Sequence, residues 1–221
     1  MPTPFIDIHS HHLISIPDIF VIQSRFVHEV DEKSEQPFSS GIHPWHLNSR
    51  PLETDFSKLE EIAKLKSCIA IGETGLDQAI GTSIDVQKQW FIRHLELAEV
   101  FKKPVIIHCV RAYSDLIQIR KTGKFKTPWI IHGFNENAKV ARDLILLNCW
   151  LSVGHRLLQE NSKVAASFPK IHIDRIFLES DDSALSVSEV YEKASLLLQI
   201  SLNDLKLQIH QNFVHLFGKL V

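Results

Sequence analysis

The chain has 221 residues, of which 44% are hydrophobic and 23% are charged, and its formal net charge is −2 at pH 7. This length and hydrophobic content suffice for one enzyme-sized domain with a substantial core, so we expect residues 1–221 to form a single domain. The near-neutral net charge means that the chain has no overall excess of Lys and Arg with which to bind nucleic acid. Any DNA contact would therefore depend on a local basic patch or on metal ions.

The cysteines and the N-terminal residues predict a cytoplasmic protein. Cys68, Cys109 and Cys149 are odd in number and far apart, which argues against a disulfide framework and for a reducing compartment. The N-terminal MPTPFIDIH lacks the basic region and long apolar stretch of a signal peptide. No apolar run is long enough to cross a membrane, so we expect no membrane partner, and no feature predicts a protein partner.

Short apolar runs alternate along the chain with longer segments of helical periodicity. The first three predicted strands are residues 5–9, 18–23 and 38–42. Residues 27–37 carry charges without an apolar period, so they predict a loop or a hairpin-like connection between strands two and three. The other predicted strands are residues 68–72, 105–108, 129–132, 150–153 and 175–179. The predicted helices are residues 52–66, 86–101, 112–121, 137–147, 157–168, 186–199 and 202–219.

This alternation favours a parallel sheet with right-handed crossovers. Eight strands in a chain of this length predict an α/β fold, a (β/α)8 TIM barrel in a compact variant with a shortened segment between strands two and three. An open doubly wound sheet is the alternative. The absence of a G-x-G-x-x-G motif and of a P-loop disfavours it.

Seven apolar runs end in, or lead directly into, a histidine or an acid. They read FIDIHSH from residue 5, SSGIH from 39, CIAIGE from 68, PVIIH from 104, WIIH from 129, WLSVGH from 150 and RIFLESD from 175. In an α/β barrel the carboxyl ends of the strands meet on one face and supply the active-site side chains. We therefore expect these residues to converge on one site.

Several of these residues are candidate metal ligands. His9 and His11 are two apart on a strand, so they point to the same face and can share one ion. Glu73 directly follows an apolar run, where an uncompensated buried charge would be costly, and its two oxygens can bridge two cations. Gly72 and Gly75 allow the backbone to turn around a ligand there. Glu73 therefore joins the two histidines as a candidate ligand.

The remaining candidates follow later strands. His108 and His132 each follow two isoleucines; one such histidine is usually a hydrogen-bonded core residue, but two in phase with the other candidates favour ligation. Asp181 is expected to ligate a cation, accept a proton from bound water, or both. Asp7 either supports a ligand or packs near the strand end. Imidazole and carboxylate together suit zinc, manganese or magnesium.

Weaker signals concern substrate binding. His43 is a candidate for binding a phosphate oxygen at the pocket rim, with a turn histidine before a proline as the alternative. Asp77 either orients a ligating histidine, binds substrate or is a solvated loop acid, and Arg111 is the nearest cation for a phosphate. Trp45 is expected to cap the barrel rim, with stacking on a base as the alternative. The histidines without supporting context, expected to be structural, are His28, His94, His172, His210 and His215.

Together these motifs resemble the TatD-type metal-dependent deoxyribonucleases of the amidohydrolase superfamily, in a short subgroup. The matching segments are DIHSH at 7–11, GIHP at 41–44, AIGETGLD at 70–77, PVIIH at 104–108, IIHGF at 130–134, LESD at 178–181 and NFVHLFG at 212–218. The resemblance implies a barrel with two divalent metal ions. It implies that His9, His11, Glu73 and Asp181 hold one ion, and that Glu73, His108 and His132 hold the other.

The sequence departs from the family pattern around the substrate rather than at the ligands. The family arginine two residues after the strand-five histidine is Val110 here, with Arg111 one place later. The proline after the strand-eight acids and the long basic loop that normally follows are missing. These departures bear on how a substrate is held.

The expected function is a TatD-like two-metal hydrolase, a phosphodiesterase or deoxyribonuclease that acts on DNA ends by metal-activated water. Asp181 is expected to act as general base, and Glu73 is the second catalytic residue. The first alternative is a hydrolase of another small phosphoester, ester or amide, because the same scaffold supports several chemistries. The second is a metal-binding scaffold without turnover, against which the retained Asp181 argues.

Overall fold

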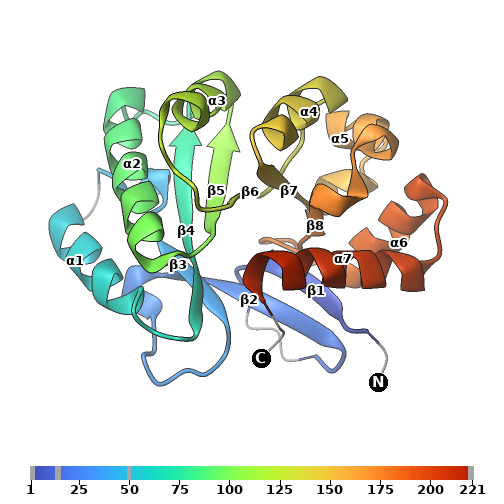
Figure 1. Cartoon of the computed structure of the whole chain (residues 1–221), viewed down its shortest axis with the longest axis horizontal. Helices are drawn as coiled ribbons and strands as arrows, with labels where there is room; N and C mark the ends of the chain where they lie inside the picture. Colours follow the sequence, from blue (N-terminus) through green and yellow to red (C-terminus); the bar gives the residue numbers. More distant parts are fainter. Residues whose placement is uncertain (1–2, 13–15, 49–50, 219–221) are drawn as a thin grey trace. The chain divides into compact units, whose positions relative to one another are not determined.

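The computed structural model describes residues 3–12, 16–48 and 51–218, in which two compact units are distinguished. One unit contains the described residues up to Gln23 and those from His132 onward, and the other contains Ser24–Ile131. Figure 1 shows the elements of both units in sequence colours.

The first unit contains a four-stranded parallel group. Its strands are β1 (Phe5–Ser10), β2 (Ile19–Phe26, whose last residues belong to the second unit), β7 (Cys149–Val153) and β8 (Ile176–Leu178). Strand β1 pairs with β2, β7 pairs with β8, and a parallel bridge between Ser10 and Asp181 joins the ends of β1 and β8. The N-terminal strand therefore lies beside the last strand of the chain.

The second unit contains the other four parallel strands. They are β3 (Phe38–Gly41), β4 (Cys68–Asp77), β5 (Val105–Val110) and β6 (Trp129–Ile131), paired in that order. The apolar side chains of residues 105–107 on β5 and of all of β6 are fully buried on both faces, as expected for parallel strands covered by helices.

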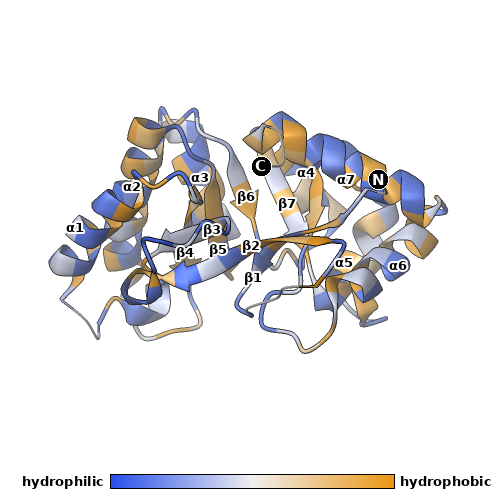
Figure 2. Ribbon diagram, turned by 90° about the horizontal axis from the view of Figure 1, so that it is seen from below, coloured by the Kyte–Doolittle hydropathy of each residue, from blue (hydrophilic) through white to orange (hydrophobic). Residues whose placement is uncertain are grey.

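The helices of the first unit are α4 (Ala138–Leu146), α5 (Lys163–Ser167), α6 (Val187–Leu198) and α7 (Leu202–Phe217). Those of the second are α1 (Leu52–Ile62), α2 (Ile84–Phe101) and α3 (Tyr113–Thr122). Helix α2 packs on β4 and α4 on β7. The ribbons of these helices carry both hydrophobic and hydrophilic stretches in Figure 2, as amphipathic helices do.

Local sequence explains where the helices begin. The side chain of Asn137 accepts hydrogen bonds from Lys139 N and Val140 N at the start of α4. Ser186 and Glu189 form a capping box at α6. Ser201 Oγ accepts from Asp204 N at the start of α7. The predicted end of α7 at residue 219 lies outside the described residues.

Two predicted elements differ from the structure. The continuous helix predicted over 157–168 is wrong: a short 3-10 helix, His155–Leu158, is followed by α5, because Ser162 caps a new helix by accepting from Ala165 N. The predicted strand over 68–72 extends to Asp77. Gly75 makes this extension possible, since its φ is +150° and a Cβ there would collide with the His108 carbonyl oxygen.

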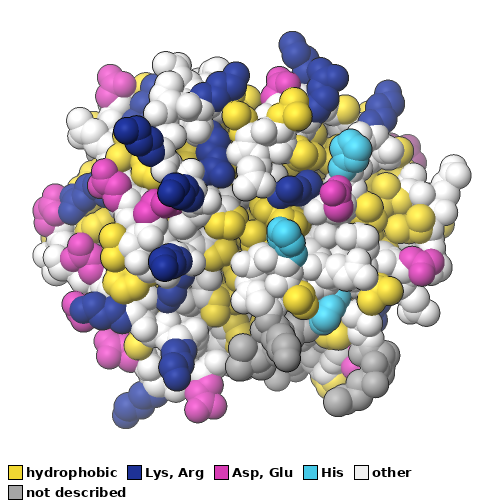
Figure 3. Space-filling view, in the orientation of Figure 1, with side chains coloured by type: hydrophobic (Ala, Val, Ile, Leu, Met, Phe, Trp, Pro, Cys, Tyr) yellow, Lys and Arg dark blue, Asp and Glu magenta, His cyan; other side chains and the backbone are white. Residues whose placement is uncertain are grey.

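The connection between β2 and β3 agrees with its prediction. In the described structure it contains one 3-10 turn, Val27–Glu29, and no α-helix. Within the described residues, no helix is both long and apolar enough to cross a bilayer. On the face shown in Figure 3, Lys and Arg side chains lie among Asp and Glu side chains, in keeping with the small net charge.

Candidate metal centre

The first unit brings His9, His11 and Asp181 together at the carboxyl ends of β1 and β8. Asp181 Oδ1 lies 3.5 Å from His9 Nε2 and 3.6 Å from His11 Nε2. The backbone fixes this approach, because His11 N donates to Asp181 O and Asp181 N donates to His9 O. The side chain of His9 is fully buried, whereas those of His11 and Asp181 are 29% and 22% exposed. One side of the group is therefore open to solvent.

His132 lies in the same unit with its ring centroid 4.4 Å from that of His9. Its partner is a residue that the sequence analysis did not single out: Glu179 Oε1 lies 3.7 Å from His132 Nδ1 and accepts a hydrogen bond from Gly133 N. Glu179 is fully buried. The sequence signal that could have identified Glu179 was its position directly after the apolar strand β8, because a glutamate is rarely buried unless it is paired.

Asp7 ties β1 to the turn that carries Asp181. Its carboxylate accepts from Ser180 Oγ at 2.6 Å and from Ser180 N at 3.0 Å. Burial raises the pKa of Asp7 to about 7, against the lowering effect of these hydrogen bonds. Of the two roles expected for Asp7, this contact agrees with the first, in which Asp7 supports a candidate ligand, here Asp181.

The second unit contains a group of similar composition, His43, Glu73 and His108. Glu73 Oε1 lies 3.0 Å from both His43 Nε2 and His108 Nδ1, and all three side chains are buried. The two imidazole rings are 4.4 Å apart between centroids. His43, a candidate for phosphate binding at the rim, therefore contacts the carboxylate of Glu73.

Asp77 lies on the other side of His108. Its Oδ2 is 3.0 Å from His108 Nε2 and accepts from Trp45 Nε1 at 2.8 Å. Burial raises the pKa of Asp77, but the hydrogen bonds from Trp45 and His108 outweigh it and leave the pKa below its ordinary value. Asp77 thereby orients His108 toward Glu73, as a carboxylate behind a metal-ligating histidine does.

Gln87 holds the backbone of Asp77 in place and is a second residue that sequence reasoning missed. Its side chain accepts from Asp77 N at 2.6 Å and donates to Asp77 O and Thr82 O. Gln87 is fully buried in α2. The only sequence signal was a glutamine among the apolar positions of that helix.

His94 has the structural role predicted for it. Its Nδ1 lies 2.7 Å from the Trp90 carbonyl, and its Nε2 accepts from Ile42 N at 3.0 Å. Burial lowers the pKa of His94 to about 4, so the ring is neutral at pH 7. The Ile42 contact fixes the end of β3 just before His43.

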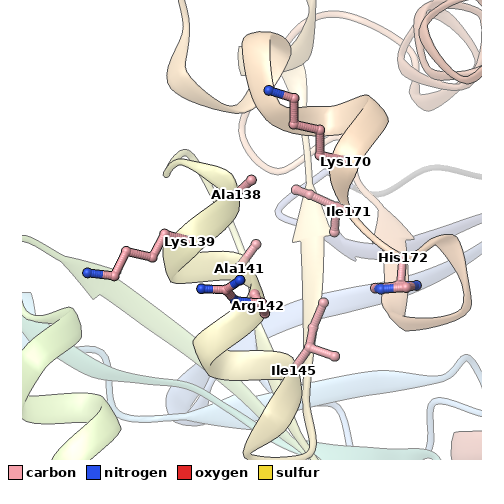
Figure 4. A pocket seen from close by; sticks show the side chains of 8 residues that line it. All are labelled: Ala138, Lys139, Ala141, Arg142, Ile145, Lys170, Ile171 and His172. Atoms are coloured by element: carbon pink, nitrogen blue, oxygen red, sulfur yellow. The ribbon is translucent and has the colours of Figure 1, made fainter.

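The remaining substrate candidate, Arg111, is exposed at the end of β5 with φ +54°. In the described part of the chain it makes no ion pair. A hollow of about 300 Å³ elsewhere has three basic side chains in its lining, Lys139 and Arg142 on α4 and Lys170 (Figure 4). It contains no carboxylate and is not the candidate metal centre.

The donor chemistry of both groups fits a divalent cation. Each offers two imidazole nitrogens and one carboxylate oxygen within 4.8 Å of one another. Mixed nitrogen and oxygen donors of this kind suit zinc and manganese, and the carboxylates also suit magnesium.

Comparisons with known proteins agree with these features. Residues 22–218 match the model of the family described as TatD related DNase. The chain is 26% identical over 204 residues to the uncharacterized metal-dependent hydrolase YcfH of Escherichia coli, covering 85% of this chain and 76% of that protein. It is 26% identical over 159 residues to the 3′-5′ ssDNA/RNA exonuclease TatD of Edwardsiella piscicida, covering 70% and 61% of the two chains.

The fold comparison covers 100% of this chain and 100% of YJJV, a TatD homolog from E. coli, with a TM-score of 0.85 and 20% sequence identity. The fold is therefore that of a TatD protein, with eight parallel strands and surrounding helices, and the predicted (β/α)8 class is confirmed. With the family model matching most of the chain, the protein is a metal-dependent hydrolase of the TatD-related DNase family.

Proposed function

We propose that this protein is a two-metal phosphodiesterase of the TatD family that removes nucleotides from DNA ends, with residues 1–221 as one hydrolase domain. The observation that carries the proposal is the pair of groups at the ends of parallel strands, each with two histidines and one carboxylate. The group of His43, Glu73 and His108 is buried, and the group of His9, His11 and Asp181 is partly open to solvent. The name of the Edwardsiella relative, a 3′-5′ ssDNA/RNA exonuclease, supports a nucleic-acid substrate.

In this proposal His9, His11, Glu73 and Asp181 hold one cation, and Glu73, His108 and His132 hold the other. When bound, two divalent cations polarise a phosphoryl oxygen and lower the pKa of the attacking water. Asp181 takes the proton of that water, which its partial exposure beside His11 permits. Glu73 would contribute to both cation sites, and His43 and Asp77 orient Glu73 and His108 through their contacts.

The substrate phosphate needs a cation from the protein, and Arg111 is our candidate because it is exposed next to the strand that carries His108. His43 and Asp77 stay candidates for substrate contact. Replacing Arg111 with Gln is expected to raise KM for an oligonucleotide severalfold, because a charge-assisted phosphate contact is lost, and to leave kcat nearly unchanged.

The test uses purified protein freed of metal and then supplied with Mn²⁺, Zn²⁺ or Mg²⁺. Oligonucleotides labelled at either end report stepwise shortening. We expect mononucleotide release that requires the cation and is abolished in Glu73→Ala and Asp181→Ala. Glu192→Ala, an exposed acid on α6, is the matched control and keeps wild-type activity. Intact oligonucleotides with every cation would refute the nuclease assignment.

A second candidate is hydrolysis of a small phosphoester, an ester or an amide. The net charge of −2 favours it, because a long polyanion gains little from a chain without a basic surplus. Cleavage of p-nitrophenyl phosphodiesters, lactones or amides without cleavage of DNA would support this candidate. Metal binding without turnover of any substrate in that panel would support a scaffold instead.

A further inference from the structure

Trp45 is unusual among the aromatic side chains of this protein. The residue is 61% exposed, and every other Phe, Tyr and Trp in the described residues is buried or half-buried. Exposed aliphatic residues are common on protein surfaces, but an exposed indole offers a large flat face that binding sites use.

Trp45 is held at two points, one on its backbone and one on its indole ring. Trp45 lies in the 3-10 helix Pro44–His46, and its backbone N donates to His43 Nδ1 at 3.2 Å. Its ring Nε1 donates to Asp77 Oδ2 at 2.8 Å. A ring fixed in this way loses little conformational entropy when a ligand stacks on it, so the stacking energy is retained as affinity.

Trp45 also lies beside the candidate metal group of its unit. Its ring centroid is 4.8 Å from that of His43 and 6.0 Å from that of His108, both in edge-to-face geometry. These two histidines are the ones that contact Glu73. A planar group resting on the indole is therefore adjacent to the residues proposed to act on the phosphate.

We propose that Trp45 is the stacking platform for the nucleobase of the nucleotide being released, an inference that rests on the proposed function for the identity of its ligand. Aromatic side chains bind single-stranded nucleic acid by stacking, and a face without polar groups accepts every base. The only polar atom of the indole, Nε1, is already bound to Asp77. Trp45 therefore contributes affinity without discriminating between bases.

The competing role is purely positional: the indole N–H orients Asp77, and through it His108. Trp45→Phe separates the two roles, because phenylalanine keeps an aromatic face and loses the N–H. Trp45→Ala loses both. Stacking predicts that the Phe variant retains most of the affinity, whereas a positional role predicts that both variants are equally impaired.

The experiment measures binding of fluorescein-labelled decathymidylate to the full chain by fluorescence anisotropy in EDTA, where cleavage does not interfere. A decamer of abasic tetrahydrofuran units with the same phosphates is the second ligand. Trp45→Ala is expected to weaken binding of decathymidylate about ten- to a hundredfold and to leave the abasic decamer unaffected. Leu196→Ala, which removes another exposed apolar side chain, is the control and is expected to change neither.

Equal weakening for both decamers, or a Phe variant as impaired as the Ala variant, would overturn the stacking role. Unchanged binding of decathymidylate by Trp45→Ala would overturn it as well. Thermal melting verifies that each variant is folded. Because binding is read without metal, a protein that binds through Trp45 but cleaves no DNA would contradict the proposed nuclease activity and leave only the stacking of a base on Trp45 standing.

Discussion

His94 makes the stability of this protein depend on pH in a way that can be calculated from the structure. Its ring is fully buried with one nitrogen beside the Trp90 carbonyl and the other accepting from Ile42 N, so only the neutral ring fits. Burial lowers its pKa from 6.5 to about 4. At about 1.4 kcal/mol per pKa unit, this difference corresponds to about 3 kcal/mol of unfolding free energy.

The direction of the pH dependence follows from the difference in the pKa of His94 between the unfolded and the folded chain. The unfolded chain protonates His94 near pH 6.5, whereas the folded chain does so only near pH 4. The contribution of His94 is therefore fully present above about pH 6.5 and is lost progressively as the pH falls toward 4.

The assay is urea unfolding at several pH values between 7.5 and 4.5, on wild type and on His94→Gln, which does not titrate. The variant is expected to be less stable at pH 7.5, because its hydrogen bonds are poorer, but the gap to wild type should shrink by about 2–3 kcal/mol by pH 4.5. Gln118→Ala, an exposed change on α3 of the same unit that removes no titratable group, should run parallel to wild type. A constant gap between His94→Gln and wild type would refute the reasoning.

Three further perturbations have definite expected outcomes. Gly75→Ala should destabilise the fold by about 3 kcal/mol and lower Tm by about 6–12 °C, because the added Cβ would collide with the His108 carbonyl oxygen. Gly81→Ala is the control in the same melting experiment and should leave Tm unchanged, because no atom lies within 4 Å of the added Cβ. Gln87→Leu should lose about 2–5 kcal/mol in urea unfolding by leaving backbone groups of β4 without partners. Glu73→Gln should weaken Mn²⁺ binding at least tenfold in calorimetry, and an unchanged affinity would remove Glu73 from the ligand set.

Local sequence patterns predict the order of the strands and the side chains at their ends. The isoleucine runs before His108 and His132 predict buried strands because short apolar segments of this kind are stable only when covered on both faces. The spacing of His9 and His11 predicts a shared face because the side-chain period of a strand is two. These are local properties, so the eight strands and the family could be recognised from the sequence.

The hydrogen-bond partners of those side chains depend on the tertiary structure. Ser180 binds Asp7 across 173 sequence positions, and Gln87 binds the backbone at the end of β4 from the first turn of α2. No local pattern encodes such pairs, because a buried polar group takes whichever partner the fold brings within hydrogen-bond distance.

The local conformation of His43 and Trp45 follows from the sequence, whereas their contacts depend on the tertiary structure. The sequence GIHPWH leaves His43 as either a phosphate-binding residue or a turn histidine, and the structure has a short 3-10 helix, Pro44–His46, directly after it. That His43 contacts Glu73, and that the Trp45 indole binds Asp77 while its ring stays exposed, depends on strands β3, β4 and β5 lying side by side. Local propensity fixes the conformation of a few residues, whereas contacts between distant residues exist only once the chain has folded around them.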